Sequence, residues 1–451
     1  MDENSTSQEE HHISGHHHMR IHWKEFFKSP DDTLIKDTTL VEKGSLVGRI
    51  GLMLLECGTG AWRVRDSMNT ISRALDITCS ADIGLLTISY TCFDVDNKSY
   101  SQTLSLPSTG VNMNKLNKLE DFVRRFETEN EYWTIGGVHH ELNQIERHTQ
   151  TYPIAISALS AGIACASFIF LLGGGLPEMI CTFFGAVIGN YLREYMEKKK
   201  ITLVAKIAAG VAVSCAVYFL CFKLGQLCFG WSYSHAYGYI GAMLYVIPGF
   251  PFITSGLDMS KLDMRSGLER LAYAILTILI ATMVGWGMAT ALSLKPGSIP
   301  ELQLNPLALT IFRLIASFCG VYGFSIMFNA KPSMAAVAAI IGAFSNTLRL
   351  NLVEFNHLPA ALAAFIGALI AGLIASFVRD KVGFPRIAIT VPAIVIMVPG
   401  LYMYRAVFNF GVTNINIGAY WIMNALMIIN ALPIGLLTAR ILTDPKWRHA
   451  D

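Results

Sequence analysis

Ten long apolar segments in the last two thirds of the chain limit its fold more than any other feature. Each is long enough to cross a bilayer, whose hydrocarbon core is about 30 Å thick. The chain has 451 residues, of which 15% are charged, and a mean hydropathy of +0.44. That charge is low for a soluble protein. We therefore expect an α-helical polytopic membrane protein with ten transmembrane helices, over 154–174, 178–196, 203–223, 236–255, 269–292, 307–328, 333–350, 359–378, 387–408 and 417–440.

The Lys and Arg residues between these segments predict the orientation, because cytoplasmic loops carry an excess of them. If the N-terminal region is cytoplasmic, the inner connections hold fifteen such residues, from Arg193 to Arg448, and the outer connections hold four. The outer four are Lys223, Lys295, Arg349 and Arg405. We therefore expect a multi-pass protein of the cytoplasmic (plasma) membrane with both termini in the cytoplasm.

Three short patterns recur in the same order in the two halves of the apolar region. "YPIAIS" at 152–157 corresponds to "NPLALT" at 305–310, and "GAVIGNYLR" at 185–193 corresponds to "GAFSNTLR" at 342–349. "VIPGF" at 246–250 corresponds to "MVPGL" at 397–401. This order predicts two five-helix repeats, 151–293 and 305–443. Because five is odd, the repeats must be inverted with respect to each other, as in many secondary transporters.

A Pro-Gly pair lies near the middle of one apolar segment in each half. Pro248-Gly249 and Pro399-Gly400 interrupt helical hydrogen bonding at mid-depth, where unwound backbone is tolerated only inside protein or beside a water-filled cavity. A simple packing kink is the alternative. Because both pairs occupy corresponding positions, we expect the four residues to form part of a substrate site, with helix ends aimed at the substrate.

The region before Pro153 is more polar and predicts a separate α+β domain over 40–150. Helical spacing occurs in 41–56, 61–77, 114–127 and 139–150, and residues 83–107 indicate a hairpin with a turn at Asp96-Asn97. We expect the order α-α-β-β-α-α. Residues 1–39, with a His tract at 11–18, are expected to be disordered, and no signal peptide is expected.

Several function classes lack support in the sequence. The net charge of +2 indicates no nucleic-acid partner. Nine cysteines form no Cys-x-x-Cys pair, and six lie in or beside apolar segments as packing residues, so no metal site or cofactor is expected. No phosphate-binding loop, His-Glu-x-x-His zinc motif or Gly-x-Ser-x-Gly elbow occurs, which gives no sign of an ATP motor or an enzyme.

The residues quoted above resemble the threonine/serine exporter family over roughly 40–440. "LLECGTGAWRVRDSMNTISRAL" is similar to that family's pattern in the soluble domain, although Gly60 and Arg65 stand where the family usually has Glu. "IPGFPFITSGLDM" and "VPAIVIMVPGLYMYRA" resemble the signatures of the two membrane repeats. The resemblance implies proton-linked export of small amino or carboxylic acids. Split relatives, with the two repeats on separate chains, are associated with dicarboxylate export.

Two intramembrane amides in corresponding positions are candidate substrate ligands. Asn190 and Asn346 are each followed three residues later by an arginine, Arg193 or Arg349. An amide can both donate to and accept from a zwitterion. The alternative for the amides is interhelical hydrogen bonding, worth about 1 kcal/mol. The arginines are candidates for gating or coupling, or they extend to the lipid headgroups.

Four further charged residues are candidates in the membrane region. Arg405 and Arg313 are possible carboxylate ligands near the outer side, and Asp258 and Glu178 are possible titrating groups for proton coupling. As alternatives, Arg405 and Asp258 would be charges at the membrane boundary and Glu178 would cap a helix. In the soluble domain, Arg63 and Asp66 share one helical face and form either a surface ion pair or a regulatory docking contact.

These observations predict a secondary active exporter of threonine- or serine-like amino acids, coupled to protons by antiport. A succinate-like dicarboxylate exporter is the first alternative, followed by a membrane-embedded enzyme or a receptor. The expected partners are a small-molecule substrate, protons and membrane lipids, with a homo-oligomer as a further possibility.

Overall fold

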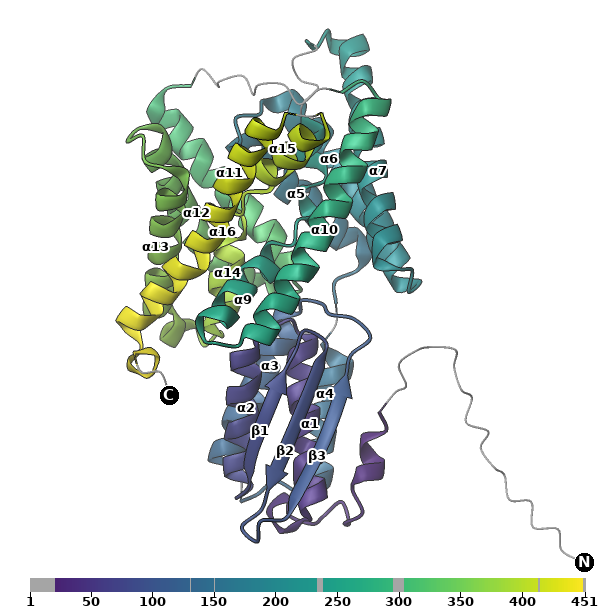
Figure 1. Cartoon of the computed structure of the whole chain (residues 1–451), viewed down its shortest axis with the longest axis vertical. Helices are drawn as coiled ribbons and strands as arrows, with labels where there is room; N and C mark the ends of the chain where they lie inside the picture. Colours follow the sequence, from purple (N-terminus) through teal and green to yellow (C-terminus); the bar gives the residue numbers. More distant parts are fainter. Residues whose placement is uncertain are drawn as a thin grey trace, which may run out of the picture.

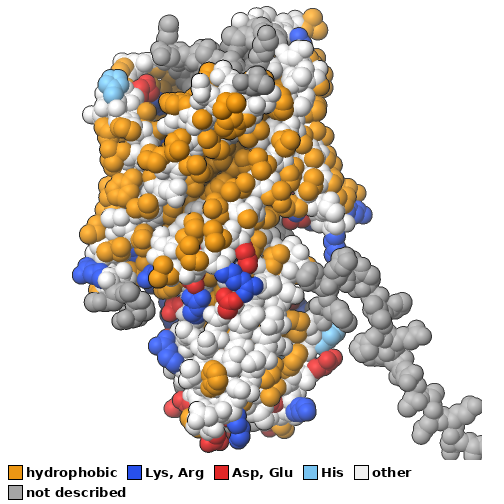
Figure 2. Space-filling model, in the orientation of Figure 1, with side chains coloured by type: hydrophobic (Ala, Val, Ile, Leu, Met, Phe, Trp, Pro, Cys, Tyr) orange, Lys and Arg blue, Asp and Glu red, His pale blue; other side chains and the backbone are white. Residues whose placement is uncertain are grey.

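The computed structural model describes residues 21–129, 131–149, 151–232, 238–294, 304–412 and 414–448. Figure 1 shows an N-terminal unit, residues 21–149, at one end of a larger helical body, residues 151–448. Hydrophobic side chains cover much of the visible face of the body in Figure 2, and charged side chains gather where the body meets the N-terminal unit. This distribution is typical of a protein whose helical part lies in lipid.

The N-terminal unit packs four helices with one antiparallel sheet. The helices are α1 (Leu40–Glu56), α2 (Ala61–Ala74), α3 (Met113–Thr128) and α4 (Ile135–His148). The strands are β1 (Thr78–Ile83), β2 (Thr87–Phe93) and β3 (Ser99–Ser105), in the order β1-β2-β3. The predicted hairpin is β2–β3, but β1 was missed because its alternating pattern directly follows α2. The order is therefore α-α-β-β-β-α-α.

Residues 21–39, expected to be disordered, are ordered against the N-terminal unit. They contain two short 3-10 helices, η1 (Trp23–Phe26) and η2 (Ile35–Asp37), and Ile35 is completely buried. The Glu42 carboxylate accepts hydrogen bonds from the backbone of Lys28, Ser29 and Thr39, at 2.8 to 2.9 Å. This cluster of donors fixes the segment and caps α1. Residues 1–20, including the His tract, lie outside the described residues.

The helical body repeats one order of elements. The first half contains α5 (Ile154–Leu171), α6 (Leu176–Lys198), α7 (Leu203–Phe229), the short α8 (Tyr239–Ala242) and η4 (Leu244–Val246), α9 (Gly249–Ser260) and α10 (Met264–Ala291). The second contains α11 (Pro306–Met327), α12 (Pro332–Glu354), α13 (Ala360–Val382), α14 (Arg386–Val395), α15 (Gly400–Gly411) and α16 (Ile415–Thr443), followed by η5 (Pro445–Trp447). In both halves the first helix packs on the second and the last two pack together, and α5 contacts α11 between the halves.

Seven of the described helices are long and apolar enough to cross a membrane: α5, α7, α10, α11, α12, α13 and α16. The segments from Tyr239 to Ser260 and from Arg386 to Gly411 are bent by 50° and 48°, so the number reaches nine if each is one span. The predicted second span, α6, is not among them, because polar residues occupy both of its ends. The chain is a polytopic membrane protein, but ten spans and their inverted arrangement stay predictions.

A buried histidine makes the stability of the N-terminal unit depend on pH. Nη1 of Arg49 donates to Nδ1 of His139 at 2.8 Å, so the imidazole accepts and is neutral. Burial, and then the positive charge of Arg49, lowers the pKa of His139 from 6.5 to about 4. Between these values the unfolded chain binds a proton that the folded unit does not, so stability falls as the pH falls from 6.5 toward 4.

We therefore predict that hydrogen-exchange protection of α1 and α4, corrected for intrinsic rates, decreases from pH 7 to pH 5 in the full chain. His139→Gln keeps an acceptor for Arg49 and removes the titration, so its protection should change less over the same range. An equal pH dependence in both proteins would contradict this assignment.

Candidate functional site

Both Pro-Gly pairs form the same local structure. Pro248 precedes α9 and Pro399 precedes α15, with φ of −81° at both and ψ of 60° and 56°. In each pair the glycine amide donates to the carbonyl of the residue before the proline, at 2.8 Å in the first half and 2.9 Å in the second. These are inverse γ-turns, which proline favours because its φ is already fixed near the required value. Each turn ends one helix and begins the next.

The two turns lie against each other between the halves. A Cβ added at Gly249 would lie 3.2 Å from side-chain carbons of Val395 and Val398, and one at Gly400 would overlap Ile247. The space between them is a cavity of about 10 Å³, lined by apolar residues and by Gly249. That volume suits one water at most. Apolar contact therefore closes the centre of the body, and a side chain at Gly400 would fit only if Ile247 moved.

The same hydrogen bond forms within each of the two Asn-Arg pairs. Nε of Arg193 donates to Oδ1 of Asn190 at 3.0 Å, and Nε of Arg349 donates to Oδ1 of Asn346, also at 3.0 Å. Both amides are fully buried. Their remaining contacts differ, since Nδ2 of Asn346 donates to Ser317 at 2.9 Å on the neighbouring α11.

The pairs lie at opposite ends of the helical body. Helix α6 ends beside the N-terminal unit, and Arg193 lines a cavity shared with that unit. Helix α12 begins beside the unit, where the Asn329 side chain donates to the Val111 carbonyl at 3.2 Å. Arg349 lies roughly 25 Å farther along α12, at 1.5 Å per residue. Helices α6 and α12 thus run in opposite directions relative to the N-terminal unit.

A cavity of about 610 Å³ connects the N-terminal unit to the first Pro-Gly turn. It is lined by the segment between β3 and α3, by the C-terminal part of α6, and by Pro248 to Pro251. Its volume lies in the range of small-molecule sites. Basic and acidic side chains share its wall, including Arg193, Glu194, Glu197, Lys198 and Lys206.

Glu194 is the site residue that sequence reasoning missed. Its carboxylate accepts from Nδ2 of Asn190 at 3.2 Å and from the hydroxyl of Ser157, and lies 3.8 Å from Nη2 of Arg193. Its position four residues after Asn190 places it on the same face of α6, and this spacing could have identified it from the sequence. The structure brings Asn190, Arg193 and Glu194 together on the cavity wall.

Asp258 joins the helical body to the N-terminal unit. It is 2% exposed, lies 3.2 Å from Nε of Arg270, and accepts from the Ala61 amide at 3.0 Å. Arg270 in turn donates to the carbonyls of Gly58 and Thr59, at 3.0 and 2.6 Å. This ion pair holds the N-terminal end of α2. The predicted coupling role of Asp258 stays a prediction beside this structural one.

The other membrane candidates have defined partners. Glu178 accepts from the Gly175 amide at 2.9 Å and caps α6, the alternative expected from the sequence. Arg313 binds Glu354 and donates to Asn351 at 2.9 Å, so it links α11 to α12. The guanidinium of Arg405 lies 4.7 Å from the ring centre of Trp421.

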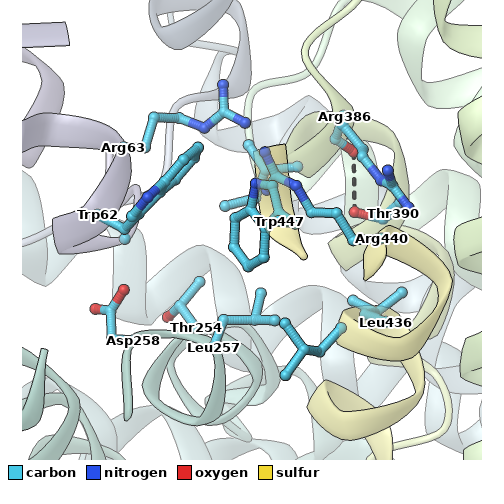
Figure 3. A pocket seen from close by; sticks show the side chains of 13 residues that line it. Trp62, Arg63, Thr254, Leu257, Asp258, Arg386, Thr390, Leu436, Arg440 and Trp447 are labelled. Atoms are coloured by element: carbon cyan, nitrogen blue, oxygen red, sulfur yellow. Dashed lines mark hydrogen bonds between the residues drawn. The ribbon is translucent and has the colours of Figure 1, made fainter. Parts of the chain in front are cut away.

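Of the two alternatives for Arg63 and Asp66, the structure does not form the ion pair within α2, and the regulatory role stays a prediction. Arg63 binds Glu120 of α3, and no ion pair joins it to Asp66 in the described part of the chain. Asp66 is exposed and does not line the cavities described here. Arg63 instead faces a smaller pocket between the N-terminal unit and the body (Figure 3).

The arrangement can bind a small polar molecule that carries one positive and one negative charge. Arg193 offers a cation and Glu194 an anion beside a buried amide, and the cavity leads from them to the closed Pro-Gly contact. Among the described residues, no group of three or more His, Cys, Asp or Glu could hold a metal ion. The site therefore has the features of a binding pathway.

Two family profiles and several curated proteins match the sequence. Residues 45–293 match the profile of a threonine/serine exporter family, and 313–442 match a second profile described as "Threonine/Serine exporter, ThrE". The chain is 26% identical over 240 residues to the "Probable succinate transporter subunit YjjP" of Escherichia coli, covering 53% of this chain and 90% of that protein. It is 22% identical over 397 residues to the "Pheromone-regulated membrane protein 10" of Kluyveromyces lactis, covering 84% of this chain and 39% of that one. No solved structure matches.

We predict that Gly249→Leu and Gly400→Leu each lower the melting temperature of the detergent-purified protein. A branched side chain at either position must separate the two turns, and such overpacking typically costs about 1–3 kcal/mol. Gly287→Leu on α10 is the control, because a Cβ there meets nothing within 4 Å. An equal melting temperature for all four proteins would show that the contact between the turns is not tight.

Proposed function

The chain belongs to the threonine/serine exporter family, and from this premise we propose that it exports small amino acids of the threonine and serine type in exchange for protons. The proposal includes the cytoplasmic membrane as its location, with the N-terminal unit and both termini in the cytoplasm. Family membership and the apolar helices establish a multi-pass membrane exporter that is not an enzyme. The substrate, the coupling and the orientation are the parts proposed.

The observation that carries the amino-acid proposal is the adjacency of Arg193 and Glu194 on the cavity wall. An amino acid needs a cation for its carboxylate and an anion for its ammonium group. The guanidinium offers paired donors to a carboxylate, and the glutamate accepts from an ammonium group. Asn190, already bonded to both, holds the two charges in a fixed geometry.

The proposed pathway runs from the cavity to the two Pro-Gly turns and on to the opposite end. The opposite directions of α6 and α12 and the matching γ-turns support two inverted repeats, which is the arrangement used for alternating access. The cavity on the side of the N-terminal unit and the closed contact between the turns fit an inward-facing state. In the outward-facing state the turns would separate on the other side.

Proton coupling is proposed to use Glu194. Unlike Asp258 and Glu178, it lines the cavity together with Arg193 and the first Pro-Gly turn, and it accepts a hydrogen bond from Asn190. Asp258 and Glu178, the candidates from the sequence, have structural partners that protonation would disturb. Protonation of Glu194 would remove the anion that attracts the ammonium group and so release the substrate.

Dicarboxylate export is the second candidate. It is supported by the name of the relatives, given as succinate transporter subunits, and by the presence of one Asn-Arg pair in each half. Two arginines would suit two carboxylates if both reached one substrate. A homo-oligomer stays a prediction; the relative named as a subunit covers 53% of this chain, whereas this chain carries both halves.

The direct experiment measures efflux of labelled threonine or succinate from proteoliposomes with an acidic or neutral exterior. A gradient of one pH unit supplies about 1.4 kcal/mol per proton. We expect threonine efflux to accelerate when the exterior is acidic and a protonophore to abolish the acceleration. Faster succinate than threonine efflux would favour the dicarboxylate alternative, and no flux of either would contradict both substrates.

A substitution in the Arg193–Glu194 pair distinguishes threonine export from succinate export. We predict that Glu194→Gln lowers threonine efflux by about tenfold, the effect of losing about 1.4 kcal/mol of binding in the rate-determining state. Succinate efflux should stay equal or rise, because a repulsive charge is removed. Glu197→Gln is the matched control, since this residue lines the same cavity and pairs with Lys206 at 3.0 Å. Equal loss for both substrates would reject the zwitterion assignment.

The Pro-Gly turns are tested by Pro248→Ala and Pro399→Ala. Alanine restores an N–H and is favoured over proline by about 3 kcal/mol inside a helix, so each variant favours a continuous helix. We predict melting temperatures equal to or above that of the wild type and lower efflux. Pro433→Ala in α16 changes a proline outside the pathway and should transport normally. If efflux follows stability across the three variants, the turns serve packing alone.

A further inference from the structure

A second pocket lies between the N-terminal unit and the second half of the body. It has a volume of about 60 Å³. Its lining residues come from α2, α9, α14, α16 and η5 (Figure 3). The N-terminal unit contributes Gly60, Trp62 and Arg63, and the charged and aromatic residues of the body that line it are Asp258, Arg386, Arg440 and Trp447. The large cavity that leads to the Pro-Gly turn has a different lining. This pocket is called the junction pocket below.

Aromatic rings hold a cationic group at the junction pocket. The Arg440 guanidinium lies 4.7 Å from the ring centre of Trp62 and 3.7 Å from that of Trp447. The Lys261 ammonium lies 4.1 Å from the Trp447 ring centre. Such contacts orient cations without neutralising them. Arg440 is therefore fixed in place with its charge intact.

Positive charge exceeds negative charge around the junction pocket. Arg63 is matched by Glu120 and Asp258 by Arg270, so these four cancel. Arg386 donates to the Thr443 hydroxyl and the Gly372 carbonyl, both at 3.2 Å, and within the described ranges no carboxylate forms an ion pair with it. Among the side chains that the structure describes, three cations, Arg386, Arg440 and Lys261, are then left with one nearby acid.

That one acid is Asp444, whose Oδ2 lies 3.8 Å from Nε of Arg440. This distance is too long for a hydrogen bond. Nε of Arg440 is buried and has no hydrogen-bond partner among the residues that the structure describes. Burying surplus charge is costly unless an opposite charge is supplied. The junction pocket therefore favours an anion.

The end of a helix adds to this attraction. Gly60, the N-cap of α2, lines the junction pocket and, as a glycine, has no side chain that could cap the helix. The positive end of a helix dipole favours negative charge within the first turn. The Ala61 amide is already used by Asp258, so a ligand would face the next part of the turn, beside Trp62 and Arg63.

We propose that the junction pocket binds a small anion, a phosphate or carboxylate group, held by Arg386 and Arg440 at the N-terminus of α2. The volume fits a group of a few heavy atoms, since one water needs about 10–15 Å³. Leu257 and Leu436 on the opposite wall allow a short apolar portion. The same chemistry is available from a free small anion and from an anionic lipid headgroup.

An anion in the junction pocket would tie three parts of the protein together. Arg386 is the first residue of α14, which leads to the second Pro-Gly turn, and Arg440 is near the end of α16. Trp62 and Arg63 belong to the N-terminal unit. Occupancy would therefore hold that unit to the second half and restrain movement of α14, whatever substrate is exported.

The test is calorimetric titration of inorganic phosphate into the full chain in phosphatidylcholine nanodiscs, at constant ionic strength. We expect saturable binding that weakens at least tenfold, about 1.4 kcal/mol, in Arg386→Gln and in Arg440→Gln. Arg379→Gln, a nearby exposed arginine, and Arg193→Gln, in the large cavity, should bind as the wild type does. Equal affinity in all variants, or no saturable binding in either lipid composition below, would overturn the proposal.

A second experiment, in nanodiscs that contain an anionic lipid, identifies the source of the anion. If nanodiscs with one third phosphatidylglycerol raise the wild-type melting temperature and abolish phosphate binding, and Arg440→Gln removes the rise, a lipid headgroup occupies the junction pocket. If phosphate binds equally in both nanodiscs and is weakened by the same variants, a free anion is the ligand. Arg386→Lys and Arg440→Lys, which keep the charge, should retain part of the affinity if the glutamine variants fail to fold.

Discussion

The two proline-centred turns contact each other inside the helical body, and the surrounding helices must enclose this contact. A break in a membrane helix leaves polar backbone that lipid cannot satisfy, so it must be enclosed by protein or water. Here each break is a γ-turn that satisfies one amide locally, and the apolar side chains of the other half cover it. The surrounding helices α5 and α11 pack against each other between the halves, which keeps both turns away from lipid.

The N-terminal unit is connected mechanically to the first of these turns. Helix α9 begins at Gly249, directly after the turn, and carries Asp258 near its other end. Asp258 and Arg270 hold residues 58–61 through a buried ion pair and three hydrogen bonds. Removing one member would leave the other charge buried without a partner, which is strongly unfavourable. A shift of α9 therefore requires a shift of the N-terminal unit or the loss of these bonds.

The parts predicted well from the sequence are those fixed by local chemistry. The length of the apolar segments predicted most of the membrane helices. The Pro-Gly pairs predicted both breaks, because a proline interrupts the helix in which it lies. Strand β1 was missed because its alternating pattern begins directly after α2, and only its pairing with β2 separates the strand from the helix. Glu194 and the partner of Arg63 were missed for a related reason: which charges meet depends on helix packing. Residues 21–39 are ordered because the Glu42 carboxylate accepts hydrogen bonds from backbone amides 13 and 14 residues before it in the chain.

The two halves keep the same backbone plan but differ in the charges that surround it. The Asn-Arg hydrogen bond has the same length in both, yet Leu350 follows Arg349 where Glu194 follows Arg193. A zwitterion would thus meet both of its counter-charges on the side of the N-terminal unit and only a cation on the other. A protein that must bind an amino acid at one face and release it at the other gains from such a difference. In the proposed exchange, the repeated fold would supply the two-state geometry, and Glu194 would supply a charge that one half carries beside its Asn-Arg pair and the other half lacks.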